Sequence, residues 1–386
     1  MDPQVVAAVV AGALTVTGTL AAQYLGRRAT NRDTENTLEE QRKHLDRTLA
    51  GQREQLDKTL AEQRTRTLNE RFATAADQLG SDKPAPRLAG VYAMAGLADD
   101  WEENRQTCVE VLCAYLRMPY EADPGQDAPE PQRLAFQAIR EVRHTVIRVI
   151  AAHLAENAAV SWQGLGFDFR GVVFDGGDFS GAQFSSGSVD FRSARFSGGE
   201  VRFSYTRFSG GWVNFSDAQF CGGRVDFMSA SFSGGTVDFY GAQFSDGEVS
   251  FGLAQFSSGS IYFHRARFSG GTADFRFAEF RGGLVNFCSE FSGGTADFRH
   301  TKFCGGTADF RFAEFRGGTV DFRDAIDWSF PPLFSWTDTP PPDVKLPQDF
   351  PDSQADSAVS LLPPAGPPLK DGPGSARADT ISLGLR

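Results

Sequence analysis

Cysteine is scarce in this chain, and its few cysteines form no familiar pattern. There are five, an odd number without a CxxC pair: Cys108, Cys113, Cys221, Cys288 and Cys304. This excludes a disulfide-stapled scaffold and argues against a zinc site. Cys221 and Cys304 stand where otherwise similar Phe-Ser-Gly-Gly units have serine. We therefore expect reduced, structural cysteines, consistent with a cytosolic environment.

Histidine is equally scarce, and the five histidines share no ligand spacing with one another or with cysteine. They are His44, His144, His153, His264 and His300. Without such spacing, a surface position is a better expectation for each of them than a metal site or a general base. The sequence thus predicts no metal ligand and no cofactor-binding residue.

Candidate acid/base pairs exist, but their repetition argues against catalysis. Asp274, Asp309 and Asp321 each precede an arginine by two residues, and the sequence GGTADFRFAEFRGG occurs twice, at 270–283 and 305–318. A catalytic site needs unlike groups at one place. Because neither copy differs from the other, we predict solvated charge ladders, no catalytic residue and no enzymatic activity.

An excess of positive charge is also absent. The formal net charge is -11 at pH 7, which does not attract nucleic acid. Pairs of glycines invite comparison with phosphate-binding loops, but no helix N-terminus follows any of them. We therefore expect no direct contact with nucleic acid.

Phenylalanine and glycine, in contrast, are abundant: the chain has 35 and 41 of them. Between residues 167 and 328 phenylalanine recurs with alternating spacings of five and seven, a 12-residue period. One residue is missing between Phe287 and Phe291. Self-similarity at a fixed period predicts a stack of similar units.

Each unit has the pattern of a short extended segment. A small residue stands two positions before each phenylalanine, as Val225 does before Phe227, and the residue between them is polar. This alternation places the small residue and the ring inside and the polar residue in water. Among the units of alternating spacing, Gly-Gly pairs occur only in the longer spacers, where they predict bulged corners, and they exclude a continuous helix.

The first units, with rings at Phe169, Phe174, Phe179 and Phe184, are spaced by five throughout. Together with units such as Ala182-Gln-Phe184 and Ala278-Glu-Phe280, they resemble the pentapeptide-repeat family. The resemblance implies a right-handed, four-sided β-helix with one pentapeptide per side, which we expect over residues 164–336, in six to seven coils. The two extra residues in alternate units predict two ridges of Gly-Gly loops.

The N-terminal segment predicts a membrane anchor. Residues 5–25 carry no charge and are long enough to span the hydrocarbon layer, so we expect a transmembrane helix over 4–26. Arg27, Arg28 and Arg32 follow it, which orients the N-terminus outside and the bulk of the chain in the cytoplasm, at an inner membrane. A buried helix is the alternative.

An 11-residue repeat follows, with copies beginning at Thr37, Thr48 and Thr59. It predicts a nearly straight coiled-coil stalk over 27–70, and residues 37–69 could form a homo-oligomer. The alternative is a solitary helix stabilised by charge pairs such as Glu54 with Lys58.

The remaining segments complete an α+β multidomain organisation. Residues 71–118 resemble a short HEAT-like helical module, 119–131 read as a linker, and 132–158 predict an amphipathic helix that caps the first coil of the β-helix. Aromatic residues from Trp328 to Trp336 could plug the last coil. Residues 337–386 read as a disordered, proline-rich tail.

These observations favour a membrane-anchored, non-enzymatic protein that offers a binding or scaffolding surface to an unidentified protein partner. Some members of the family mimic DNA and occupy topoisomerases, which is the alternative function. That alternative predicts a strongly negative stripe along one face of the β-helix.

Overall fold

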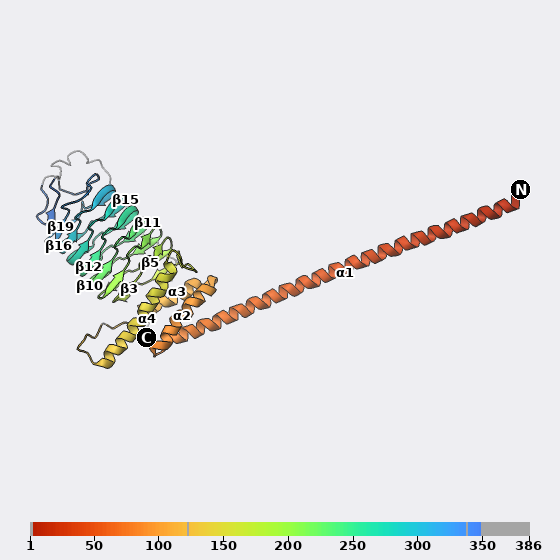
Figure 1. The fold of residues 1–386 in the computed structure, drawn as a ribbon, viewed down its shortest axis with the longest axis horizontal. Coiled ribbons are helices and arrows are strands. Elements are labelled where there is room, and N and C mark those ends of the chain that lie inside the picture. Colours follow the sequence, from red (N-terminus) through yellow and green to blue (C-terminus); the bar gives the residue numbers. More distant parts are fainter. Residues whose placement is uncertain (1–2, 122, 337–338, 349–386) are drawn as a thin grey trace, which may run out of the picture. The chain divides into compact units, whose positions relative to one another are not determined.

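A computed structural model describes residues 3–121, 123–336 and 339–348; the side chains of most residues before Thr37 lie outside that description. The chain divides into two compact units. One comprises Met1–His153 with Asn157–Phe169 and is helical; the other comprises Leu154–Glu156 with Arg170–Arg386 and is a β-solenoid. Figure 1 shows both units, helices first and solenoid second.

A single long helix dominates the first unit. Helix α1 runs from Pro3 to Leu79, 77 residues without interruption. It is straight in Figure 1, and no proline interrupts it after its first residue. The domain boundaries predicted at 26/27 and 70/71 therefore fall inside one helix, because nothing in the local sequence stops helical hydrogen bonding there.

Three shorter helices complete this unit: α2 (Pro84–Asp100), α3 (Arg105–Arg117) and α4 (Glu130–Leu154), with a short 3-10 turn η1 (Glu102–Asn104) and strand β1 (Phe167–Asp168). The C-terminal end of α1 packs on α2 and α3. Apolar side chains that are almost fully buried make the core: Leu68, Ala75, Leu79, Val91, Leu97, Leu112, Val146 and Ile150. Helix α4 begins at Glu130 and ends at Leu154, within a few residues of the predicted helix.

The membrane helix predicted over 4–26 gains no support here. Within the described residues, no helix combines the length and the apolar character needed to cross a membrane. The predicted segment lies where the backbone is helical but most side chains are outside the description. The anchor and its orientation therefore stay predictions.

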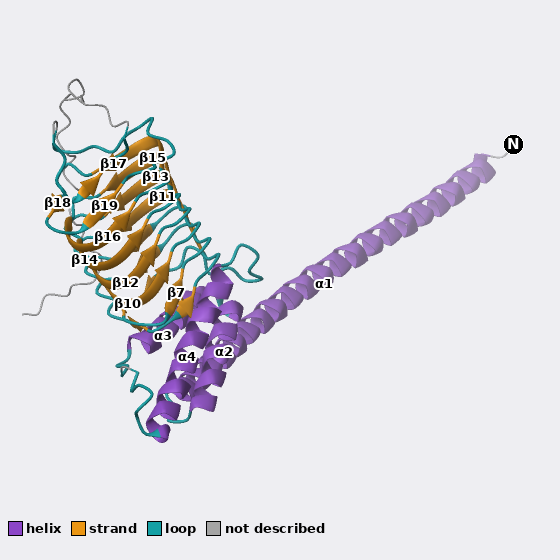
Figure 2. Cartoon of the chain, turned by 60° about the vertical axis from the view of Figure 1, so that its left-hand side comes forward, coloured by secondary structure: helices purple, strands orange, loops and turns teal. Residues whose placement is uncertain are grey.

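The second unit consists of parallel strands stacked coil upon coil, about seven turns in all (Figure 2). The strands are β2 (Val173–Phe174), β3 (Gly177–Asp178), β4 (Gln183–Phe184), β5 (Ser188–Asp190), β6 (Arg195–Phe196), β7 (Glu200–Arg202), β8 (Arg207–Phe208), β9 (Trp212–Asn214), β10 (Gln219–Asp226), β11 (Ser231–Asp238), β12 (Gln243–Ser250), β13 (Gln255–Tyr262), β14 (Arg267–Asp274), β15 (Glu279–Asn286), β16 (Glu290–Asp297), β17 (Lys302–Asp309), β18 (Glu314–Phe315), β19 (Thr319–Asp321) and β20 (Val344–Lys345). One sheet runs β5-β9-β11-β13-β15-β17 and the other β2-β6-β10-β12-β14-β16-β19-β20.

Register between coils follows the sequence period. Phe220 of β10 pairs with Phe244 of β12, and Phe244 with Phe268 of β14, so a coil holds two 12-residue units. Rings of successive coils stack face to face, for example Phe215 on Phe239 at 4.8 Å between centroids. Irregular register in most of these long strand pairs, as between β10 and β12, falls where a Gly-Gly pair bulges the strand. The predicted stack, its inward rings and its bulged corners are confirmed.

The missing residue is absorbed in one corner. Pairing shifts from 24 residues to 23 between Phe268 and Phe291. In that corner the Ser289 hydroxyl is buried and donates to the Phe263 carbonyl at 2.6 Å. A serine thus completes a turn that other coils make with one more residue.

Aromatic residues cover the C-terminal end of the solenoid. Trp328 lies edge-on to Phe303, Phe334 lies edge-on to Phe322, and Trp336 lies edge-on to Phe315. Beyond them, β20 pairs with β19 although the sequence predicted disorder from residue 337. Val320 donates to the Asp343 carbonyl and Phe322 to the Lys345 carbonyl. The prediction was wrong for 339–348, because two residues suffice to extend an unpaired strand edge. Residues 349–386 lie outside the described part.

Candidate interaction surface

The histidine with the most elaborate surroundings is His153 in the helical unit. Its Nε2 lies 3.2 Å from the Asp99 carboxylate, its Nδ1 lies 2.6 Å from the Val149 carbonyl, and its ring stacks on Trp162 at 3.9 Å. The Trp162 indole also donates to Asp99 at 2.9 Å. Both ring nitrogens face protein acceptors, so this cluster joins helices and offers no free nitrogen to a substrate. The expected surface position of His153 was wrong.

The cysteines do not form a reactive site either. All five are free, and Cys108 and Cys113 are buried. Burial raises the pKa of the Cys108 thiol to about 11 and that of Cys113 to about 12. Burial, with the nearby Asp309 and Glu314 carboxylates, also raises the pKa of Cys288. Thiols held protonated at neutral pH are poor nucleophiles.

Among the described residues, no three His, Cys, Asp or Glu side chains gather closely enough to hold a metal ion. The acidic residues of the solenoid are instead engaged by neighbours in the chain. One group of them directly precedes a core ring in the Val-x-Phe or Ala-x-Phe strand that follows a Gly-Gly corner.

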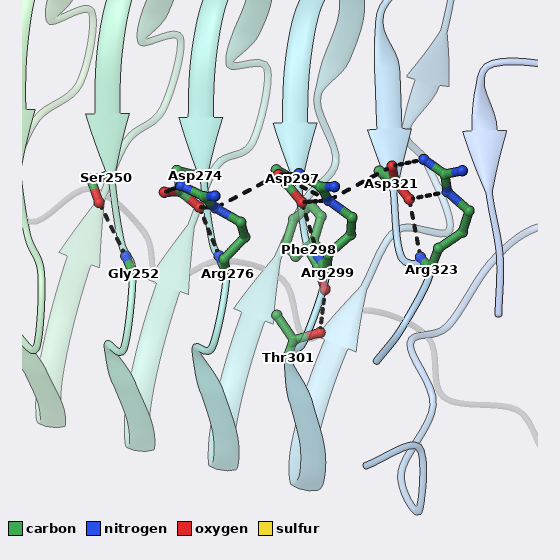
Figure 3. A network of polar contacts seen from close by, with 10 residues as sticks. All are labelled: Ser250, Gly252, Asp274, Arg276, Asp297, Phe298, Arg299, Thr301, Asp321 and Arg323. Atoms are coloured by element: carbon green, nitrogen blue, oxygen red, sulfur yellow. Dashed lines mark hydrogen bonds and ion pairs between the residues drawn. The ribbon is translucent and has the colours of Figure 1, made fainter. Parts of the chain in front are cut away.

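These carboxylates are mostly buried rather than in water. The Asp297 carboxylate accepts a hydrogen bond from the backbone N–H of Arg299 at 3.0 Å; a single core phenylalanine separates the two residues in the chain. Both carboxylate oxygens also accept hydrogen bonds from the Arg299 guanidinium. Asp274 and Asp321 repeat this arrangement (Figure 3). The expectation that the polar residue faces water was therefore wrong at these positions, since the side chain closes the turn beside it.

The three pairs connect into a ladder of alternating charge. Arg276 also approaches Asp297 of the next coil at 3.7 Å, and Arg299 approaches Asp321 at 4.0 Å (Figure 3). The aspartate side chains are buried, whereas the arginine side chains are half-exposed and lie nearer the solvent. This face of the solenoid is thus balanced in charge and does not form the negative stripe that DNA mimicry predicts.

A neighbouring arginine lowers the pKa of one of these carboxyls, that of Asp321. Burial acts to raise the pKa of Asp321, but hydrogen bonds from Arg323 outweigh it, and the pKa lies below its ordinary value. Asp238 has Tyr240 in place of that arginine, and there burial raises the pKa. Asp321 is therefore held charged and paired with Arg323, which does not suit a proton-transfer role.

A different feature distinguishes one corner of the solenoid. The second residue after each core ring at this corner adopts a left-handed backbone conformation, with φ between 57° and 60° where it is not glycine. We call these residues turn column A: Gly181, Tyr205, Ser229, Leu253, Phe277, His300 and Asp324. Backbone hydrogen bonds join successive corners, as from Leu253 N–H to the Arg276 carbonyl at 3.1 Å.

Large apolar side chains occupy this column where glycine would be least strained. Tyr205, Leu253 and Phe277 are 63%, 52% and 46% exposed, and Phe277 stacks on His300 at 4.9 Å. A left-handed conformation costs a residue with a Cβ about 1 kcal/mol or more. Strain combined with exposure of apolar surface is typical of binding sites.

The equivalent corner on the other edge serves as a comparison. Its left-handed residues, turn column B, are Gly171, Ser193, Asp217, Gly241 and Arg265. These are small or polar, but Phe312, two residues after the core ring Phe310 on the same edge, is 66% exposed. The contrast with turn column A was not noticed in the sequence, where both columns read as variable positions; sorting those positions by alternate 12-residue units would have separated them.

The family comparison agrees with this architecture. The family model described as pentapeptide repeats (9 copies) matches residues 169–219, the part in which rings recur every five residues before the spacing lengthens. This chain is a pentapeptide-repeat protein. Neither the comparison with curated proteins nor that with solved structures finds a match. In this pentapeptide-repeat protein the solenoid continues well past the matched residues, through coils with enlarged Gly-Gly corners.

Proposed function

We propose that this pentapeptide-repeat protein is a non-enzymatic binding or scaffolding protein, and that its solenoid recognises a protein partner through turn column A. The observation that carries the proposal is the exposure of Tyr205, Leu253 and Phe277 in strained positions on separate coils of one edge. A β-solenoid presents such residues at regular intervals on a rigid support.

The surroundings of turn column A indicate the chemistry of the partner. The guanidiniums of Arg276, Arg299 and Arg323 lie beside it and are 46%, 38% and 51% exposed, whereas their aspartates lie beneath. An arginine already paired with one carboxylate can donate hydrogen bonds to a second carboxylate on a partner protein. The partner is a protein segment with an apolar ridge bordered by acidic side chains.

The test replaces the three apolar residues with glycine, as Tyr205→Gly, Leu253→Gly and Phe277→Gly together. Glycine relieves the left-handed strain, so the stability of the fold should change by no more than about 1 kcal/mol per site. Binding of the partner should weaken at least tenfold, because the apolar contacts are lost. Affinity capture from detergent-solubilised membranes, with each captured protein quantified, measures this.

The matched control changes turn column B in the same way, with Ser193→Gly, Asp217→Gly and Arg265→Gly. Capture should remain at the level of the unmodified chain. Equal loss with both triple variants would assign binding to another surface. Equal partner lists from the full chain and a chain lacking residues 167–328 would refute recognition by the solenoid altogether.

We also propose that residues 5–25 attach the protein to the inner membrane in a single pass, with the N-terminus outside. The uncharged run and the arginines after it support this. The full chain should sediment with membranes and resist alkaline extraction, whereas Val9→Asp with Leu14→Asp should release it, since buried carboxylates oppose insertion. Intact unmodified protein in the soluble fraction would contradict the anchor.

A further inference from the structure

Helix α1 carries an apolar stripe that is exposed among the residues that the structure describes. We define the leucine stripe as Leu38, Leu45, Leu49, Leu56 and Leu60; these side chains are between 43% and 60% exposed. Further along the same helix, Leu68, Ala75 and Leu79 are almost completely buried against the helical unit. Within the described part of α1, the leucine stripe is exposed and the later apolar residues are buried.

The geometry of the stripe follows from its 11-residue period. Eleven residues make three turns at about 3.67 residues per turn, close to the relaxed helix, so the stripe stays on one side of a straight helix. The two leucines of each repeat lie about 33° apart around the axis. Such a narrow, straight seam fits another helix laid along it.

The two borders of the leucine stripe differ in chemistry. At about 98° per residue, Gln41 and Gln52 line one border and Arg42 and Arg53 line the other. The stripe is thus bordered by a neutral hydrogen-bonding edge and an arginine edge, with Asp46 and Asp57 about 33° beyond the arginines. Outside the borders, the Glu39 and Lys43 pair, 2.7 Å apart, belongs to the solvated side.

These borders select an orientation if the occupant is a second copy of the chain. In a parallel pair the right border of one helix faces the left border of the other, so each arginine edge meets a glutamine edge and can donate to its amide oxygens. In an antiparallel pair, like borders meet and the arginine edges repel each other. Two copies side by side are therefore complementary in the parallel arrangement.

We propose that a second copy of this chain covers the leucine stripe, forming a parallel, in-register two-stranded coil. This inference does not depend on what the solenoid binds. The resulting dimer carries two solenoids. A partner with two binding sites would therefore bind the dimer far more tightly than it binds a single solenoid.

The test uses the full chain, solubilised in detergent, with Cys221, Cys288 and Cys304 replaced by serine. A single cysteine is then introduced as Leu38→Cys or, separately, as Leu60→Cys. A parallel, in-register pair brings each new cysteine opposite its own copy, so both variants should form disulfide-linked dimers on mild oxidation. Glu40→Cys, on the opposite side of the helix, is the control and should not crosslink.

Solution mass provides the second readout. The unmodified chain should be a dimer by light scattering, and Leu49→Arg with Leu56→Arg should raise its dissociation constant at least 100-fold. Glu40→Arg with Glu62→Arg, which adds the same side chains to the outer side, should leave the dimer intact. Arginine favours helix, and circular dichroism checks that α1 persists.

A monomeric unmodified chain at tens of micromolar would overturn the proposal. A dimer in which neither Leu38→Cys nor Leu60→Cys crosslinks to itself would overturn the parallel register. A trimer or tetramer would overturn the two-stranded arrangement.

Discussion

Replacing Gly235 with alanine is expected to destabilise the solenoid by about 3 kcal/mol or more. Gly235 has φ of +68°, and a Cβ there would lie 2.5 Å from the Gly211 carbonyl oxygen and 2.7 Å from the Gly210 carbonyl carbon. Both atoms belong to the backbone of the previous coil. Because parallel hydrogen bonds fix the distance between coils, no side chain can move aside to admit the methyl group.

The chain itself suggests the control, Gly234→Ser. A Cβ on Gly234 would collide with the Ser209 carbonyl oxygen, yet the same place one coil later holds Ser258, whose hydroxyl donates to the Ser233 carbonyl. The first residue of this corner can therefore shift, and the loss should stay near 1 kcal/mol. Chemical denaturation followed by circular dichroism measures both variants. Equal stability of the two would show that the second glycine is not sterically required.

Replacing Phe239 with alanine should cost about 3 to 5 kcal/mol. The ring is fully buried and stacks between Phe215 at 4.8 Å and Phe263 at 4.7 Å, with Phe227 and Phe251 edge-on to it. A cavity in this column cannot collapse, because the surrounding rings are held by ladders on every side. The cost should therefore fall in the upper part of the range.

Two other substitutions distinguish cavity formation from a general intolerance of change. Phe239→Leu keeps most of the volume, and its loss should be about 1.5 kcal/mol or less. Tyr240→Ala, at the half-exposed neighbouring position, should change the free energy of unfolding by about 0.5 kcal/mol or less. Denaturant midpoints of the three variants give the order. A loss below about 1 kcal/mol for Phe239→Ala would mean that the ring column contributes little.

The repeat predicted much of the solenoid because its information is local. The period of 12 determines which side chains point inward, and a side chain such as Phe239 or Val237 needs no knowledge of distant residues to be assigned to the core. The Gly-Gly pairs likewise predict corners, since few other residues tolerate a positive φ. The uncharged run of residues 5–25 and the 11-residue repeat after it are local patterns too, and the anchor and the stalk that they predict stay predictions.

What the sequence could not predict depends on contacts between neighbouring coils and between segments that the fold brings together. Asp297 reads as a surface residue until the neighbouring coil and Arg299 are placed around it. Val344 reads as part of a disordered tail until the edge of β19 is available for pairing. His153 reads as a surface histidine in the sequence. The fold places it against Asp99, which lies 54 residues earlier in the chain, and against Trp162, which follows it in the chain.

The sequence by itself determined that this protein winds into a phenylalanine-filled β-solenoid after a helical part, because periodic spacing assigns each residue to the inside or the outside. Only the tertiary structure decided which outward residues are buried, paired or left exposed at strained corners such as Phe277. The physical reason is that exposure and hydrogen bonding are set by the coil above and the coil below, and the spacing of one repeat carries no record of them.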